Sequence, residues 1–179
     1  NQILTKFEGN DLGDLKWYLS VSIYTDPVTK AIHLNQESFS RAIVKKYGMD
    51  KAKQKFTPCP AGTKLTRVQC PITEYERLEC AKFDYRGCVG SLLYLTRMTR
   101  PDLAYVIGEL CGFLDNPGTR HIDICKYVLR YLAATYDYGL SYVTRTLMHL
   151  GTTEMLTRNQ LVGFLCVLWV ASLLTLVRS

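Results

Sequence analysis

The sequence predicts an α+β fold, in which a β-hairpin is followed by a mainly helical region and an apolar C-terminal tail. Three observations support this class. One stretch is rich in aromatic and β-branched residues, as strands are. Several later stretches repeat apolar residues every three or four positions, as amphipathic helices do. The chain has 179 residues, 47% of them hydrophobic and 21% charged, so it can bury a core.

The hairpin is expected at the start of the chain. Residues 17–24 (WYLSVSIY) favour a strand, and residues 31–34 favour a second strand that runs back along it. Between them, residues 25–30 (TDPVTK) consist of residue types that are common in turns.

A helix and a linker are expected next. Asn35 is suited to cap the helix, and Gly48 is suited to end it. One apolar stripe runs along this helix: Phe39, Ile43 and Tyr47. From residue 49 to about residue 75 the chain is basic and contains several prolines, which predicts a loop or linker.

Three more helices and a short strand are expected in the second half. The first helix begins near Phe83 and ends before Thr99, and the second begins at Pro101 and runs to about Leu114. Thr119 can cap the third helix. The apolar face of that helix is formed by Ile122, Cys125, Val128, Leu129 and Leu132. A short strand follows at residues 139–143.

The cysteines give little sign of disulfides or of a metal site. There are seven of them, an odd number, and no two form a C-x-x-C pair. The three histidines lie far apart and complete no zinc-binding pattern with them. We therefore expect reduced thiols, no metal and a cytoplasmic or nuclear location. The first ten residues form no apolar run, so we expect that the protein is not secreted.

Nothing in the sequence predicts a catalytic centre. Nucleotide transfer by two metal ions requires carboxylates held close together, usually including an Asp-Asp pair, and the chain contains no Asp-Asp dipeptide. It also lacks a phosphate-binding glycine loop and the common hydrolase motifs. We expect that the isolated chain is not an enzyme and uses no cofactor.

Basic residues in the first half suggest a different activity. They begin at the end of the first helix and continue into the linker: Lys45, Lys46, Lys51, Lys53, Lys55, Lys64 and Arg67. Such residues can contact a nucleic-acid backbone without reading its sequence. From spacing alone, a solvated helix end followed by a lysine-rich linker is the favoured interpretation. Similarly, Trp17 and Tyr18 could stack on a base or pack into a core.

Several segments resemble the copia-type retrotransposon reverse transcriptases. Residues 7–23 (FEGNDLGDLKWYLSVSI) are similar to the family's F-x-M-x-D-L-G-x-L-x-x-F-L-G-I, and residues 32–49 to its I-x-L-S-Q-x-x-Y-x-x-x-I-L-x-x-F-x-M. The segment TPCPAGTKL matches T-P-x-x-x-G-x-x-L. The most specific stretch is 85–142, which follows Y-R-x-x-V-G-S-L-x-Y-L, T-R-P-D, F-x-x-x-P-x-x-x-H and L-R-Y-L-x-G-T-x-x-x-G-L-x-Y in order. The resemblance covers about three quarters of the chain.

The resemblance implies a position within a larger polymerase. Residues 1–34 would be a hairpin from the end of the palm, residues 35–82 a thumb-like helix with its basic linker, and residues 83–143 a helical connection region. The segment that resembles the primer grip is Trp17, Tyr18, Leu19 and Ser20. The partners implied are an RNA or DNA template–primer duplex and the remainder of the Pol polyprotein. The parent enzyme would use magnesium.

Three residues depart from the family pattern. Ser20 and Ala134 stand where the family has glycine, and Tyr127 replaces a basic residue. These departures suggest that the constraint on the sequence is relaxed.

The tail leaves two interpretations open. Residues 144–179 would be a truncated or frameshifted start of the ribonuclease H domain, because residues 161–164 begin its first strand and the expected aspartate does not follow. Alternatively, the uncharged residues 161–177 would anchor the chain in a membrane. Because residues 161–164 fit the family strand, the first interpretation is favoured.

Overall fold

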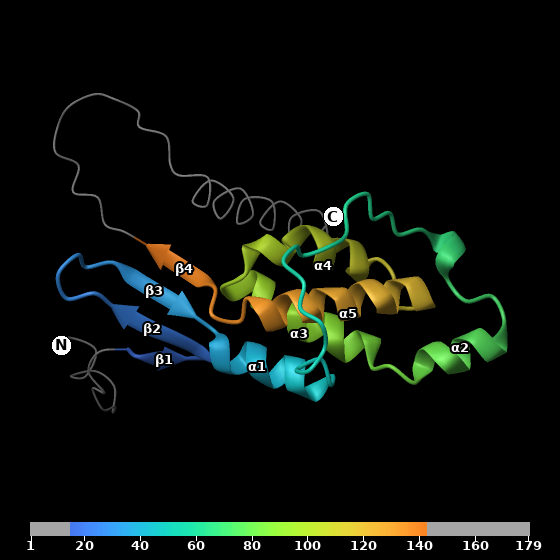
Figure 1. Cartoon of the computed structure of the whole chain (residues 1–179), viewed down its shortest axis with the longest axis horizontal. Coiled ribbons are helices and arrows are strands. Elements are labelled where there is room, and N and C mark those ends of the chain that lie inside the picture. Colours follow the sequence, from blue (N-terminus) through green and yellow to red (C-terminus); the bar gives the residue numbers. More distant parts are fainter. Residues whose placement is uncertain (1–14, 143–179) are drawn as a thin grey trace, which may run out of the picture.

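One antiparallel sheet joins the two ends of the described chain (Figure 1). The structure, a computed structural model, describes residues 15–142. Its strands lie in the order β1-β2-β3-β4. They are β1 (Trp17–Tyr18), β2 (Val21–Thr25), β3 (Ile32–Asn35) and β4 (Gly139–Tyr142). The expected hairpin is the β2–β3 pair, and the last strand completes the sheet by pairing with β3.

The strand expected over residues 17–24 is two strands, because the chain reverses at Leu19 and Ser20. These residues have φ values of 47° and 62°. Two successive positive φ angles are typical of the tight type I′ turns that join antiparallel strands. The hydroxyl of Tyr94 donates to the carbonyl of Leu19 and holds this turn against the helices. Ser20, one of the departures from the family glycine, thus occupies a conformation that glycine adopts without strain.

The helices form a layer that extends from one end of the sheet (Figure 1). They are α1 (Glu37–Lys46), α2 (Glu74–Ala81), α3 (Tyr85–Met98), α4 (Ala104–Cys111) and α5 (Thr119–Ala134), with short 3₁₀ turns η1 (Arg67–Gln69) and η2 (Pro101–Leu103). Helices α1, α3 and α5 contact one another, and α4 packs on α3. Because β3 leads into α1 and α5 leads into β4, the sheet and the helical layer are connected twice.

The helix boundaries differ from the expected ones in several places. The N-cap of α1 is Gln36, and the Asn35 side chain accepts a hydrogen bond from the Glu37 amide instead. Gly48, with φ of 66°, ends the helix as predicted. The helix expected over 101–114 is η2 followed by α4, and α5 is capped by Gly118 rather than Thr119.

Helix α2 lies where the sequence predicted a linker. Its N-terminus is a capping box, in which the Glu76 amide donates to Thr73 Oγ1 over 3.3 Å and the Thr73 amide donates to Glu76 Oε2 over 3.2 Å. The two hydrogen bonds satisfy backbone amides that would otherwise lack partners at the start of the helix. The prolines and glycine before Thr73 hid this short helix within a turn-rich segment.

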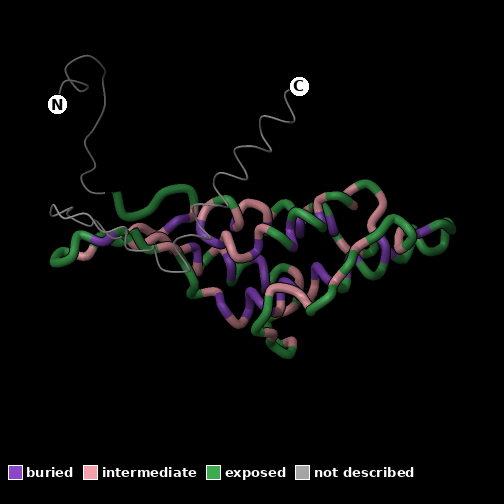
Figure 2. Tube along the Cα trace, turned by 90° about the horizontal axis from the view of Figure 1, so that it is seen from above, coloured by how far each residue is buried: buried purple, intermediate pink, exposed green. Residues whose placement is uncertain are grey.

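The core lies between α3, α4 and α5, where buried positions gather in the middle of the molecule (Figure 2). Its fully buried side chains include Leu92, Leu95, Leu103, Ile107, Leu110, Leu129 and Leu132. Burial of one such side chain contributes about 1.5–3 kcal/mol relative to leaving it in water. The apolar face predicted for the last helix is confirmed, because all five of its residues are buried. The cysteines of the described region are free thiols.

A buried arginine connects the end of α3 to the end of α5. Arg100 donates to the Thr135 carbonyl over 2.7 Å, to Thr135 Oγ1 over 2.8 Å and to both carboxylate oxygens of Asp102. Asp102 also accepts from the Tyr131 hydroxyl over 2.8 Å. Burial opposes the charge of Arg100, but the Asp102 carboxylate and Tyr131 together outweigh it and raise the pKa of the guanidinium. The T-R-P-D segment therefore holds the helical layer together.

The residues of the tail interpretations, 144–179 and 161–177, lie outside the described residues. Across residues 15–142, none of the helices has the length and apolar character needed to span a bilayer.

Candidate nucleic-acid interface

The basic loop after α1 is fixed on the surface of α5. Arg130 Nε donates to the Lys53 carbonyl over 2.7 Å, and the Lys55 amide donates to the Arg130 carbonyl over 3.3 Å. One turn earlier on α5, the Tyr127 hydroxyl lies 2.9 Å from Thr57 Oγ1. These contacts hold a segment without regular secondary structure in one place. Its lysine side chains are therefore displayed beside those of the helix.

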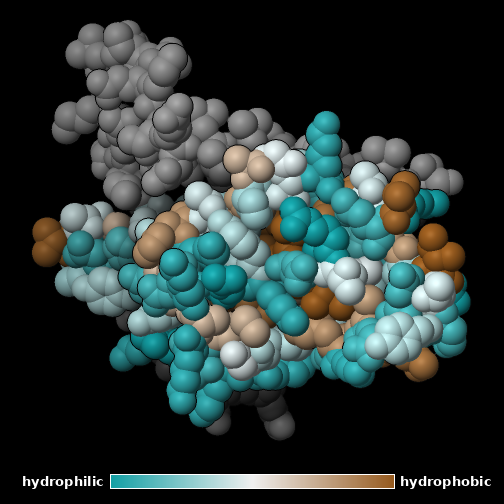
Figure 3. Space-filling view, turned by 45° about the vertical axis from the view of Figure 1, so that its right-hand side comes forward, coloured by the Kyte–Doolittle hydropathy of each residue, from teal (hydrophilic) through white to brown (hydrophobic). Residues whose placement is uncertain are grey.

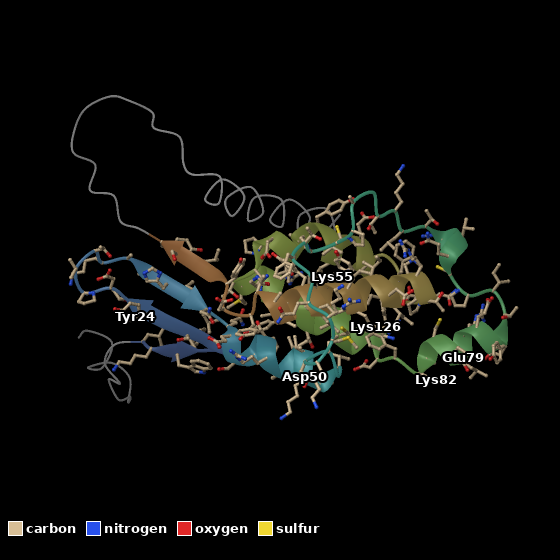
Figure 4. All side chains as sticks on the ribbon, in the orientation of Figure 1. Tyr24, Asp50, Lys55, Glu79, Lys82 and Lys126 are labelled. Carbon is tan, nitrogen blue, oxygen red and sulfur yellow. The ribbon has the colours of Figure 1, made fainter. Side chains whose placement is uncertain are left out.

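A groove of about 400 Å³ lies between this loop and α5. The loop lines it with Met49, Ala52 and Pro60, and the helix lines it with Arg120, Lys126 and Arg130. Asp123 is the acidic residue of the lining. In Figure 4, the labelled Lys55 and Lys126 both lie over α5. Lys51, Lys53 and Lys55 do not line the groove itself, but they lie on the loop whose backbone is hydrogen-bonded to Arg130 beside it. We call the groove together with these three loop lysines the basic groove.

Two of the lysine ammonium groups lie close to aromatic rings. Lys55 Nζ lies 5.1 Å from the centre of the Tyr127 ring, and Lys126 Nζ lies 5.3 Å from the centre of the Phe83 ring. An ammonium group at this distance is attracted by the negative face of a ring. Figure 3 shows hydrophilic side chains over much of this side of the molecule, with hydrophobic atoms between them. The aromatic contacts restrict where the amines can lie, while Lys126 and Lys55 keep solvent access.

The predicted basic residues fall into three groups, and only the first lies on the loop that borders the groove. Lys51, Lys53 and Lys55 lie on the loop beside α5. Lys45 and Lys46 end α1, where Lys46 Nζ is 3.4 Å from the Asp84 carboxylate. The Asp84 pKa is lowered by the hydrogen bond from the Gly87 amide and further by Tyr47 and Lys46.

Lys64 and Arg67 form the third group and do not line the groove. The Lys64 carbonyl accepts from Gln69 Nε2 over 3.3 Å, and Arg67 begins the short turn η1. This turn contacts the N-terminal end of α5, since a Cβ added at Gly118 would lie 1.8 Å from the Gln69 carbonyl oxygen. Lys64 and Arg67 thus lie on the surface next to the N-terminal end of α5, outside the groove.

Sequence reasoning missed the contribution of α5 to the site. Lys126 and Arg130 stand four residues apart on the polar side of an amphipathic helix, which is a visible signal of a basic stripe. Arg120, two turns earlier, completes the lining. What the sequence could not supply is that the loop lysines lie beside this stripe, because the connection between Arg130 and Lys53 spans 77 positions.

The residues that resemble the primer grip lie elsewhere. Trp17 and Tyr18 form β1, and Leu19 and Ser20 form the turn that follows. Both aromatic side chains are more than half exposed, at 54% and 56%, so they do not pack into the core. They lie at the sheet, near the N-terminal end of α1, while the basic groove lies beyond its C-terminal end (Figure 1). A helix of 10 residues is about 15 Å long, so the two sites are separate.

The part of the chain that the structure describes contains no group of His, Cys, Asp or Glu side chains that could hold a metal ion. Asp84, Asp102 and Asp123 have individual structural surroundings: a helix N-cap, the Arg100 network and the groove wall. The arrangement is suited to binding an anionic polymer.

Comparisons with known proteins identify relatives of the chain. It is 36% identical over 129 residues to the retrovirus-related Pol polyprotein from transposon TNT 1-94 of Nicotiana tabacum, a match that covers 72% of the chain and 10% of that polyprotein. It is 33% identical over 135 residues to the Pol polyprotein from transposon RE2 of Arabidopsis thaliana, covering 75% of the chain and 9% of the polyprotein. An uncharacterised mitochondrial protein of Arabidopsis thaliana is 32% identical over 141 residues, with 78% of the chain and 54% of that protein covered. The chain spans about a tenth of the length of the transposon polyproteins. No family model and no solved structure matches it.

Proposed function

The chain belongs to the copia-type retrotransposon Pol polyproteins, and on this basis we propose that it binds the backbone of an RNA or DNA template–primer duplex without extending the primer. In this proposal, the sheet is the end of a reverse-transcriptase palm, α1 and the basic loop belong to a thumb, and α3 to α5 form a connection region. Its partners are the duplex and the remainder of the Pol polyprotein, in the cytoplasm or nucleus.

The basic groove is the observation that carries the proposal. Arg120, Lys126 and Arg130 of α5 line the groove together with the acid Asp123, and the loop adds Lys55, whose Nζ lies over the ring of Tyr127. Nucleic-acid phosphates neutralised by such cations release counterions, which makes binding strong at low salt and weak at high salt. Because the contacts reach phosphates rather than base edges, we expect little preference for sequence.

The proposal that binding occurs without polymerisation rests on the acidic residues. Two metal ions at a polymerase centre need carboxylates that share them, and the sequence contains no Asp-Asp dipeptide. The magnesium of a parent enzyme would be held by residues outside this stretch of the polyprotein. A primer-extension assay with template, primer, nucleotides and magnesium or manganese tests this part. We expect no extension by this chain, and extension that survives further purification would overturn it.

The binding proposal is tested by fluorescence anisotropy with a labelled duplex over a range of salt concentrations. The double variant Lys53→Glu/Lys126→Glu places two negative charges in the basic groove. We expect a loss of affinity of at least tenfold at low salt, and a plot of log K against log salt that is less steep by about 2. Two duplexes of unrelated sequence should lose affinity equally.

The matched control is Arg77→Glu/Lys82→Glu on α2, which makes the same change in net charge away from the groove. Both side chains are exposed, with ion pairs only to neighbouring residues of α2 or its C-cap. If the control weakens binding as much as the groove variant does, affinity depends on overall charge and the groove proposal is wrong.

A further inference from the structure

One face of the sheet gathers aromatic side chains from three strands. Trp17 on β1 lies opposite Ser22 on β2, so these two side chains point to the same face. Tyr24 lies two residues after Ser22 and therefore also points there. Tyr24 lies opposite His33 on β3, which in turn lies opposite Ser141 on β4. Trp17, Tyr24 and His33 thus share a face.

The Trp17 and Tyr24 rings are exposed, the His33 ring is half-buried, and contacts constrain the orientation of Tyr24 and His33. Trp17 is 54% exposed and Tyr24 is 59% exposed. The Tyr24 and His33 rings are stacked, with centres 5.9 Å apart and planes inclined by 26°. His33 Nδ1 lies within hydrogen-bonding distance of Ser141 Oγ, at 2.8 Å, which fixes the imidazole against β4. Trp17 is the diagonal neighbour of Tyr24, so the two side chains begin about 7–8 Å apart.

From this arrangement we infer that the face is a stacking platform for the unpaired bases of a single-stranded nucleic acid. Flat rings on a four-stranded antiparallel sheet can each take the face of one base, and stacking accepts any base. The inference extends the proposed function, on which it rests for the class of ligand. It adds a second site, at the sheet. This site contacts the bases, whereas the basic groove contacts the phosphates.

The composition of the face favours a nucleic acid over an apolar protein surface. The side chains around the rings include the small polar residues Ser22, Asn35 and Ser141. The carboxylate nearest to His33 along β2 is that of Asp26, directly after the strand, and it accepts hydrogen bonds from the Val28 and Thr29 amides and the Thr29 hydroxyl. The apolar strand residues alternate to the opposite face of the sheet: Val21, Ile23, Ile32, Leu34, Leu140 and Tyr142. An apolar protein partner would bind that opposite face.

The test compares two oligonucleotides with the same number of phosphates. One is oligothymidine, and the other is an abasic oligomer of equal length, which keeps the backbone and lacks bases. We expect the full-length protein to bind oligothymidine about tenfold or more tightly than the abasic oligomer. Trp17→Ala/Tyr24→Ala should bring this affinity ratio down to about one, because it weakens the binding of oligothymidine and leaves that of the abasic oligomer unchanged. Trp17→Phe keeps a ring and should retain much of the ratio.

Tyr142→Ala is the matched control, because Tyr142 is 55% exposed on the opposite face of the same sheet. It should leave the ratio unchanged, and the thermal unfolding of each variant shows that it is folded. A ratio near one for the wild-type protein, or a ratio that Trp17→Ala/Tyr24→Ala leaves intact, would overturn the platform.

The groove variant separates this inference from the proposed function. Lys53→Glu/Lys126→Glu should weaken binding to both oligomers by the same factor and leave their ratio unchanged. If it affects neither oligomer while the ratio is large, the groove proposal fails and the platform stands. If it weakens both while the wild-type ratio is one, the groove proposal stands and the platform fails.

Discussion

Arg100, at the end of α3, donates to the backbone carbonyl of Thr135, at the end of α5, over 2.7 Å. Both residues are buried, at 1% and 3% exposure. Their neighbours extend the link, since Thr99 Oγ1 donates to Gln36 Oε1 over 2.9 Å at the start of α1. Two adjacent residues therefore connect the beginning of one helix to the end of another. This gives the T-R-P-D and L-x-G-T segments of the family resemblance a common structural purpose.

Replacing Arg100 with Met should destabilise the protein by roughly 3 kcal/mol, because it leaves the Asp102 carboxylate and the Thr135 carbonyl without their charged partner. Urea unfolding followed by circular dichroism measures the change. Arg97→Met, at an exposed position of the same helix, should change stability by less than about 0.5 kcal/mol. Equal effects of the two variants would contradict the assigned importance of the buried network.

Gly139 is required by the close approach of β4 to β3. A Cβ at this position would lie 2.2 Å from the Leu34 carbonyl oxygen, so Gly139→Ala should cost about 1–3 kcal/mol through strain. Gly90 is a matched position on α3 where an added Cβ meets nothing within 4 Å. There, Gly90→Ala should stabilise the helix by about 0.5–1 kcal/mol. Thermal unfolding should therefore shift in opposite directions for the two substitutions.

Ser20 offers a stabilising substitution. A residue with a Cβ in the left-handed region costs about 1–2 kcal/mol, and Ser20 has φ of 62°. Ser20→Gly removes this strain but adds flexibility to the unfolded chain, so we expect a net gain of roughly 0.5–1 kcal/mol. Ser22→Gly, within β2, lacks the strain relief and should instead destabilise. A loss of stability from Ser20→Gly would show that the turn has another conformation.

His121 makes stability depend on pH. Its ring is fully buried, stacks on Phe113 with centres 4.1 Å apart, and accepts a hydrogen bond from the Gly118 amide at Nδ1 over 2.9 Å. Burial lowers the pKa of His121 below its ordinary value of 6.5. The unfolded chain therefore takes up a proton at a higher pH than the folded protein does. The contribution of the neutral His121 ring to the free energy of unfolding is fully present above about pH 6.5. It is lost as the pH falls through the pKa that His121 has in the folded protein.

Urea midpoints measured at pH 7.5, 6.5 and 5.5 test this dependence. The wild-type midpoint should fall across the series, while His121→Gln, which cannot take up the proton, should vary less. The carboxyl groups with lowered pKa values, Asp26, Glu76 and Asp84, have ordinary values of 3.8, 4.5 and 3.8 and so titrate below this range. The same decrease in both proteins would exclude His121 as its source.

Local patterns predicted the helices well, and long-range contacts account for what was missed. The stripes of α1, α3 and α5 are read directly from spacing, because a helix repeats its faces every few residues. The turn at Leu19 and Ser20 contains no glycine or asparagine, so it was read as continuous strand. The pairing of β4 with β3 joins residues such as His33 and Ser141, which are 108 positions apart, and periodicity carries no information at that range.

For the candidate site too, the residue types were predictable from the sequence, but their placement in space was not. The loop lysines were predicted from charge alone, since a run of cations is visible without a fold. Their placement beside Lys126 required the tertiary contact of Arg130 with Lys53. Likewise, Trp17 was identified as a residue that could stack, but its grouping with Tyr24 and His33 depends on the register of β1, β2 and β3.

The pairing of β4 with β3 has a consequence for the order in which the chain can fold during synthesis. A ribosome releases helices α1 to α5 before residues 139–142 emerge. Until then, the backbone amides and carbonyls along the outer edge of β3 have no strand to pair with, and such an edge can recruit other chains. A nascent chain halted before Gly139 should therefore hold a formed helical layer and an incomplete sheet that is prone to self-association.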